Sequence, residues 1–306
     1  MKILVTGGAG FIASHIVDAY INAGHNVAVV DNLSMGFERN INTKAKFFKM
    51  DIRSEELQSM FAEFRPDVVN HHAAQMDVRK SVANPMYDAE INILGGINLM
   101  ECCKEYGVKK FIFASTGGAI YGEQDYFPAD ELHPQRPLSP YGIAKLTAEK
   151  YLFYYKEVFG LNYTALRYAN VYGPRQSTMG EAGVVAIFAS KMLNCEQPII
   201  NGDGLQTRDY VFVEDVVQAN VLALNDARTT EYNIGTRIET NVNELFHAIK
   251  KMCNSNVAEK HGEAKAGEQK RSVLSAKRIS EQLGWKQTVD LQEGLKRTVE
   301  YFKQQK

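Results

Sequence analysis

Tyrosine and lysine stand four residues apart at Tyr141 and Lys145, in the stretch Ser-Pro-Tyr-Gly-Ile-Ala-Lys. On a helix this spacing places both side chains on one face, about one turn apart. A free phenol has a pKa of about 10 and is a poor base at neutral pH. An adjacent ammonium group favours the phenolate and lowers that pKa, so the pair is suited to proton transfer. By itself the spacing is also typical of an ordinary solvated helix face.

A pair of hydroxyl groups lies upstream, where a predicted strand over residues 110–114 ends. Ser115 and Thr116 follow that strand directly. Thr116 could form a hydrogen bond with the oxygen atom that exchanges a proton with Tyr141. The alternative for Thr116 is that its side chain only caps a turn. Thr116, Tyr141 and Lys145 form the predicted catalytic set.

A glycine-rich turn near the N-terminus is predicted to hold the cofactor for this chemistry. A short apolar strand over residues 2–6 leads into Gly-Gly-Ala-Gly-Phe-Ile-Ala and then into a helical pattern over residues 11–23. This order favours a pyrophosphate cradle, because small residues let the backbone approach and the helix N-terminus supplies N–H groups and positive dipole. The spacing is Gly-x-x-Gly-x-x-Ala, with Ala13 where a dinucleotide fingerprint has a third glycine. A tight turn without a ligand is the alternative.

An acidic residue, Asp31, follows the second predicted strand, residues 26–30. At that place a carboxylate can accept hydrogen bonds from the adenosine ribose and repel a 2′-phosphate, so the sequence favours NAD over NADP. A turn cap is the alternative role for Asp31. The loops after two further predicted strands, 46–50 and 67–70, are expected to line the same crevice. These loops carry Asp51, Ile52, Ala73, Ala74 and Gln75.

Composition argues against several classes of partner. The chain has 306 residues, of which 45% are hydrophobic and 23% charged, and a net charge of −1. These values are typical of a globular protein and give no electrostatic footprint for nucleic acid or an anionic membrane. No apolar run approaches membrane-spanning length, and the four cysteines form no metal-ligand pattern. We expect a cytoplasmic protein that binds a small molecule and no metal.

Ordered motifs extend along the chain. They are Thr6–Ile12, Asp31–Ser34, Ser115–Gly122, Tyr141–Lys145, Arg167–Gln176 and Arg208–Val211. Together they resemble the extended short-chain dehydrogenases, and best the UDP-glucose 4-epimerase group. The resemblance implies an α/β fold with a Rossmann-like doubly wound parallel sheet over residues 1–170, to which later segments return. It also implies a smaller mixed α/β lobe, mainly residues 171–306, that binds a nucleotide sugar, and a homodimer.

The resemblance further implies roles for single residues. Those implied to bind NAD are Gly7, Gly10, Phe11, Ile12, Asp31, Asn32, Asp51, Ile52, Ala73, Ala74, Gln75, Asn92, Tyr141 and Lys145. Those implied to bind a UDP-sugar are Thr116, Tyr141, Asn170, Arg208, Lys265 and Ser272. Lys265 stands where the family carries an arginine, so it would offer the diphosphate a point charge in place of a guanidinium fork. Ser272 falls where the family gates the room beside the sugar C2, so a small serine would admit a 2-acetamido group.

These roles imply 4-epimerisation of a UDP-hexose, UDP-glucose and UDP-galactose with their N-acetylated forms as possible further substrates, through a transient 4-keto sugar. Relatives that dehydrate or decarboxylate such a sugar carry extra acid or base side chains where this chain has Gly118 and Ala119, so 4-epimerisation ranks first. The alternatives left open are a UDP-uronic acid 4-epimerase, another nucleotide-sugar oxidoreductase or dehydratase, a dehydrogenase that releases NADH, and a non-catalytic NAD-sensing module.

Overall fold

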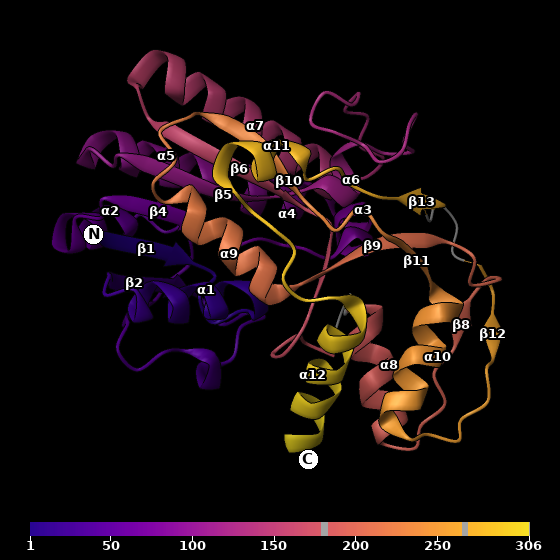
Figure 1. The fold of residues 1–306 in the computed structure, drawn as a ribbon. Helices are drawn as coiled ribbons and strands as arrows, with labels where there is room; N and C mark the ends of the chain where they lie inside the picture. Colours follow the sequence, from indigo (N-terminus) through magenta and orange to yellow (C-terminus); the bar gives the residue numbers. More distant parts are fainter. Residues whose placement is uncertain (179–182, 265–268, 306) are drawn as a thin grey trace.

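A seven-stranded sheet forms the larger part of the protein, seen in a computed structural model that describes residues 1–178, 183–264 and 269–305. The strand order is β10-β6-β5-β4-β1-β2-β3, and every neighbouring pair is parallel. The strands are β1 Lys2–Thr6, β2 Asn26–Asp31, β3 Lys46–Lys49, β4 Val68–His71, β5 Lys110–Thr116, β6 Asn162–Tyr168 and β10 Thr230–Ile234. The predicted Rossmann-like α/β sheet is confirmed (Figure 1).

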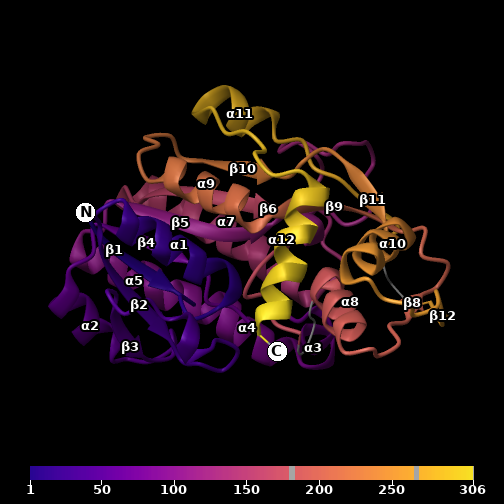
Figure 2. The same cartoon turned by 60° about the horizontal axis from the view of Figure 1, so that its bottom comes forward.

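Helices cover both faces of this sheet (Figure 2). Those on the first face are α1 (Phe11–Asn22), α9 (Val213–Ala223) and α11 (Lys277–Leu283). Those on the second face are α2 (Leu57–Phe64), α5 (Gly95–Tyr106) and α7 (Pro140–Phe159). Strand residues such as Val29 and Phe111 are fully buried. Burial on both faces explains why the strands read as continuous apolar runs in the sequence.

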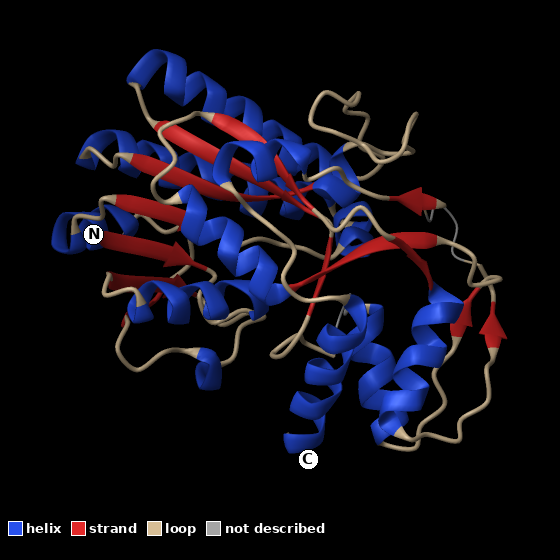
Figure 3. Ribbon diagram, in the orientation of Figure 1, coloured by secondary structure: helices blue, strands red, loops and turns tan. Residues whose placement is uncertain are grey.

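A smaller mixed sheet is built around β9 (Thr207–Phe212). This strand pairs in parallel with β7 (Asn170–Tyr172) and β13 (Arg271–Ser272), and antiparallel with β11 (Glu239–Asn241). The remaining elements of this part are β8 (Ile200–Asn201), β12 (His261–Gly262), α8 (Val184–Leu193), α10 (Val242–Cys253) and α12 (Leu291–Gln304). Figure 3 shows these strands and helices as a group beside the large sheet. The predicted smaller α/β lobe is therefore present.

The chain crosses between the two parts more than once. After β9, helix α9 packs on α1, and β10 adds to the edge of the large sheet (Figure 1). A buried polar cluster joins these distant segments: Asn70 Nδ2 donates to Asn220 Oδ1 at 2.9 Å, and Tyr20 OH donates to the Asn220 carbonyl oxygen at 3.2 Å. Residues late in the sequence thus complete the first sheet.

The connection between β4 and β5 is more irregular than the single helix that the sequence suggests over residues 85–106. It contains α3 (Val78–Ala83), α4 (Pro85–Ala89) and the π-helical turn η2 (Glu90–Leu94), which runs into α5. Such turns insert an extra residue into a helix and often occur at functional sites. The other short elements are η1 (Glu38–Asn40) and α6 (Gly117–Ile120). No helix in the described part of the chain is long and apolar enough to cross a membrane.

Candidate active site

The carboxyl end of β5 and the first turns of α7 form the centre of the candidate site. Thr116 is the last residue of β5, and Tyr141 and Lys145 lie in the first two turns of α7. The helix begins at this point because Ser139 caps it, its side-chain oxygen accepting a hydrogen bond from the Gly142 N–H at 3.2 Å. Strand end and helix start therefore place all three predicted catalytic side chains in one region.

The side chain of Lys145 is buried and reaches β5. Its Nζ donates to the Ala114 carbonyl oxygen at 2.8 Å, and lies 4.7 Å from the centre of the Phe113 ring and 5.8 Å from that of Tyr141. Burial lowers the pKa of Lys145 to about 8, although nearby carboxylates oppose this effect. The ammonium group lies beside the phenol ring, on the shared helix face that the spacing predicts.

Thr116 and Asn170 border one small space beside Gly118. A Cβ built on Gly118 would lie 3.8 Å from Thr116 Oγ1 and 3.9 Å from Asn170 Oδ1. Asn170 is the first residue of β7, so this amide comes from the smaller sheet and the hydroxyl from the larger one. Because residue 118 is glycine, it brings no acid or base of its own to this space.

The glycine turn has the form that a pyrophosphate cradle requires. Gly7 has φ +71°, and a Cβ on it would lie 2.7 Å from the Ala73 backbone nitrogen. Gly10 is the N-cap of α1, and Phe11 and Ile12 follow in its first turn. The N–H groups of a first helical turn have no acceptor within the helix, so they can donate to an anion. These residues fit the phosphates of a dinucleotide.

Replacing Gly7 by alanine is expected to reduce the amount of dinucleotide that the purified protein retains. The matched control is Gly24→Ala, because Gly24 has φ +82° with no atom within 4 Å of a built Cβ. Both variants carry the cost of a positive φ, about 1–2 kcal/mol, but only Gly7→Ala also collides with the loop after β4. Chemical denaturation and enzymatic assay of acid-released NAD measure the two effects. Equal NAD retention in both variants would contradict the placement of the cradle.

Asp31 ends β2, as predicted, and supports the glycine turn. Its carboxylate accepts hydrogen bonds from the N–H groups of Ala9 at 3.0 Å and Leu33 at 2.8 Å, and burial raises its pKa. The turn-capping role is therefore present in the structure. Carboxylate oxygens can accept further hydrogen bonds, so the ribose role stays a prediction.

Asp51 and Ile52 follow β3 and differ in what they offer a cofactor. Asp51 accepts hydrogen bonds from Asn32 Nδ2 and from Arg53, each at 2.9 Å, and Arg53 lowers the pKa of Asp51 to about 2. The Ile52 side chain is buried in the core, and its carbonyl oxygen accepts a hydrogen bond from Asn98 at 2.9 Å. Asp51 and Asn32 present polar atoms at the crevice, whereas the Ile52 side chain belongs to the core.

A hydrogen-bonded group joins the loop after β4 to the π-helical turn. Ala73 and Ala74 lead to Gln75, whose N–H donates to Asn92 Oδ1 at 2.9 Å, while Asn92 Nδ2 donates to the Gln75 carbonyl oxygen at 2.8 Å. Asp88 completes the group and was missed from the sequence. It stands one turn before Asn92, so the only available signal was a polar pair at i,i+4 on one helix face.

Two of the predicted substrate residues lie next to each other on the smaller sheet. Arg208 of β9 and Ser272 of β13 are register partners, and Ser272 is buried at 3% exposure. Asn170 pairs with the same strand farther along, opposite Tyr210. Strand β9 therefore links the diphosphate and sugar residues that the resemblance implies. Lys265 lies outside the described residues.

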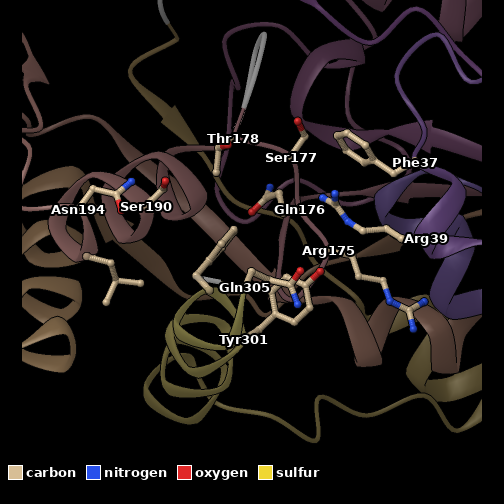
Figure 4. A pocket seen from close by; sticks show the side chains of 12 residues that line it. Phe37, Arg39, Arg175, Gln176, Ser177, Thr178, Ser190, Asn194, Tyr301 and Gln305 are labelled. Carbon is tan, nitrogen blue, oxygen red and sulfur yellow. The ribbon is translucent and has the colours of Figure 1, made fainter.

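A pocket of about 450 Å³ lies elsewhere, between the loop after β2, the segment after β7 and the ends of α8 and α12. In Figure 4 the Arg39 side chain extends toward Gln176, whereas Arg175 points away to α1, where it pairs with Asp18 at 2.8 Å. Of the described residues that line this pocket, none is a predicted site residue. Nor do the described residues contain a cluster of three acidic, histidine or cysteine side chains that could hold a metal ion.

Comparison with known proteins adds to this geometry. The family model described as "NAD dependent epimerase/dehydratase family" matches residues 3–235. The chain is 50% identical to the putative UDP-glucose 4-epimerase of Methanocaldococcus jannaschii, over 98% of each chain.

Two solved structures resemble this one over nearly their whole length. The UDP-glucose 4-epimerase of Thermotoga maritima, solved with UDP-glucose, has a TM-score of 0.98 at 50% identity and covers 100% of this chain and 99% of its own. The UDP-glucose 4-epimerase of Thermus thermophilus, in complex with NAD, has a TM-score of 0.94 at 44% identity, with 99% of each chain covered. The chain belongs to the NAD-dependent epimerase/dehydratase family.

Proposed function

We propose that this NAD-dependent isomerase is a UDP-glucose 4-epimerase, which inverts C4 between UDP-glucose and UDP-galactose. The observation that carries the proposal is that Thr116 ends β5, on the same side of the sheet as the glycine turn, and that Lys145 reaches this strand from the α7 face it shares with Tyr141. The names and bound ligands of the relatives from M. jannaschii and T. maritima support the same substrate.

Different groups of residues bind the different parts of NAD. The glycine turn and the start of α1 take the pyrophosphate, and Asp31 with Asn32 takes the adenosine ribose. Lys145 and the group around Asn92 lie on the nicotinamide side. When bound, NAD supplies the reversible oxidation chemistry at C4 of the sugar.

Proton transfer falls to the pair on α7. The phenolate of Tyr141 accepts the proton of the sugar 4-hydroxyl and later returns it to the same oxygen, while the Thr116 hydroxyl hydrogen-bonds that oxygen. Lys145 favours the phenolate because its ammonium group lies beside the ring. Burial lowers the pKa of Lys145 to about 8, so the ammonium group is still mostly protonated at pH 7.

Inversion requires that the sugar present its second face while the nucleotide stays bound. Arg208 suits the anchoring role, because a guanidinium group binds diphosphate oxygens in pairs. Asn170 borders the sugar side beside Thr116. Ser272 is next to Arg208 in register, and its small side chain is the feature that we expect to admit a 2-acetamido group.

An NMR assay of the purified protein without added cofactor tests the proposal. UDP-galactose, UDP-N-acetylgalactosamine and UDP-galacturonic acid are supplied separately, and product and NADH are followed. Conversion of UDP-galactose to UDP-glucose without accumulation of NADH is expected, and conversion of the acetylated sugar would support the role of Ser272. No conversion of UDP-galactose, even with NAD added, would refute the assignment.

We also propose a homodimer formed through α5 and α7. Large apolar side chains are exposed on α7 and on the segment that leads into α5: Phe153 at 57% and Val158 at 56% on α7, Met86 at 73% on α4 and Leu94 at 58% on η2. Exposed apolar residues gathered on neighbouring helices mark an interaction surface. Sedimentation of the wild type as a dimer, and of Phe153→Asp as a monomer with unchanged circular dichroism, is the expected result. A wild type that is monomeric at micromolar concentration would contradict it.

A cytoplasmic location is proposed as well. Cys102 and Cys103 are adjacent and buried and form no disulfide, a pattern typical of proteins in a reducing compartment. Fractionation of cells that express the tagged protein tests this, and recovery with secreted material would refute it.

A further inference from the structure

Asp88 is a carboxylate buried in α4, with 1% of its surface exposed. Its Oδ1 accepts hydrogen bonds from Gln75 Nε2 at 2.9 Å and from Asn92 Nδ2 at 3.0 Å. Its Oδ2 is also buried and accepts no hydrogen bond from the described residues. Two donors on one oxygen and none on the other leave the carboxylate incompletely solvated. A buried charge of this kind is costly unless a cation lies near.

Lys145 is a buried cation on α7, the helix that packs against α4. Helix α4 packs against α7, and the Asp88 charge raises the pKa of Lys145, more than does Glu149 one turn farther along α7. The effect is mutual, since Lys145 lowers the pKa of Asp88 against the raising effect of burial. The two buried side chains are therefore coupled through the interior of the protein.

The other groups around Lys145 do not supply a countercharge of equal effect. Strand β5 offers a carbonyl oxygen and the Phe113 ring. The end of strand β4 offers His71, and the residue after it is His72. Burial lowers the pKa of both, with the Lys145 charge adding to the shift, so they are neutral at pH 7. Glu149 is engaged elsewhere, in a bidentate pair with Arg167. Asp88 is the carboxylate left to balance the ammonium group.

We propose that Asp88 is a positioning residue that supplies the buried countercharge of Lys145 and ties it to the Gln75–Asn92 group at the nicotinamide side of the crevice. The proposal deepens the proposed epimerase function and rests on it for its catalytic meaning. In that function Asp88 keeps Lys145 protonated in a site whose burial would otherwise discharge it. Because Lys145 must be charged to favour the Tyr141 phenolate, Asp88 extends the working pH range on the alkaline side.

The substitution Asp88→Asn separates charge from shape. An asparagine keeps an oxygen that can accept from Gln75 and Asn92, but it removes the negative charge. The matched control is Asp77→Asn, the same change at a buried carboxylate of the neighbouring loop, which caps α3 by accepting from the Lys80 N–H at 3.0 Å. Asp77 does not contribute to the pKa shift of Lys145.

The first readout does not depend on catalysis. Protein labelled with ¹³C at lysine Cε is titrated by NMR, and the Lys145 signal is assigned by its absence in Lys145→Arg. The titration midpoint of Lys145 is expected to fall by about one pH unit or more in Asp88→Asn, because an opposite charge is lost, and to stay unchanged in Asp77→Asn. Because this titration needs no substrate, it succeeds or fails independently of the epimerase assignment.

A second variant covers the case in which Asp88→Asn does not fold. In Lys145→Met, the Asp88 carboxyl, followed by ¹³Cγ NMR, is expected to titrate at higher pH than in the wild type, because coupling between two sites is reciprocal. In the activity arm, the alkaline limb of the kcat–pH profile shifts to lower pH in Asp88→Asn by the same amount as the Lys145 midpoint. The proposal would be overturned if the titration midpoint of Lys145 were unchanged in Asp88→Asn and that of Asp88 were unchanged in Lys145→Met. It would also be overturned if the Lys145 midpoint shifted in Asp88→Asn while the kcat–pH profile stayed the same.

Discussion

Tyr141→Phe is expected to lower kcat for UDP-galactose by about 10²–10⁴-fold, the usual contribution of a positioned acid or base. The substitution removes the phenol oxygen and leaves the ring, which lies 5.8 Å from Lys145 Nζ. It also leaves the backbone N–H of residue 141, which donates to Ser81 Oγ at 3.2 Å and helps to fix the start of α7. The effect should therefore fall on turnover, with retained NAD and thermal stability close to those of the wild type.

The control for this variant is Tyr106→Phe, the same change at the last residue of α5. Tyr106 precedes the amino end of β5, whereas Thr116 stands at its carboxyl end, so the two residues lie at opposite ends of the strand. The kcat of Tyr106→Phe should match that of the wild type in the NMR assay. A Tyr141→Phe enzyme within tenfold of wild-type kcat would show that another group transfers the proton.

Arg167→Met is expected to lower the free energy of unfolding by about 3–5 kcal/mol, the typical cost of breaking a buried ion pair. Arg167 is 1% exposed and binds Glu149 through Nε at 3.0 Å and Nη2 at 2.6 Å. Its Nη1 donates to Tyr121 OH at 3.1 Å. Removal of the guanidinium leaves Glu149 buried with Ser115 Oγ, at 2.6 Å, as its remaining hydrogen-bond donor among the described residues.

Chemical denaturation of Arg167→Met and of two comparison variants separates the energy of an ion pair from the cost of leaving a buried charge unpaired. Arg136→Met, at an exposed pair with Asp125, should change the free energy of unfolding by about 1 kcal/mol or less. The double variant Arg167→Met with Glu149→Leu should recover much of the loss, because no uncompensated charge remains. A single variant that loses less than the exposed control would show that the Glu149 charge is stabilised by other groups.

The fold was predictable where local pattern and local physics agree. The strand, glycine turn and helix at the N-terminus lie where the sequence places them, as β1 and α1, and Asp31 ends β2 as expected. Ser139 and Pro140 indicate the start of α7, because serine is a common N-cap and proline is common in a first helical turn. The face shared by Tyr141 and Lys145 then follows from helix geometry alone.

What the sequence did not predict depends on contacts between distant segments. The hydrogen bond that Gln75 donates to Asp88 and the pairing of Arg208 with Ser272 join residues on different elements. The spacing of residues along the sequence does not reveal such contacts. The side chain of Ile52 lies in the core, which its place after a strand does not reveal, and the role in NAD binding that the resemblance implies for Ile52 stays a prediction.

The position of β10 has a consequence for the order in which the protein is made. Synthesis proceeds from the N-terminus at about 5–20 residues per second, and residues 1–170 leave the ribosome well before β10 (Thr230–Ile234). Until then β6 is a sheet edge without its neighbour, and Asn70 and Tyr20 lack their partner on α9. For several seconds the nascent chain thus exposes an apolar strand edge and unpaired polar groups, which is the kind of surface that chaperones bind.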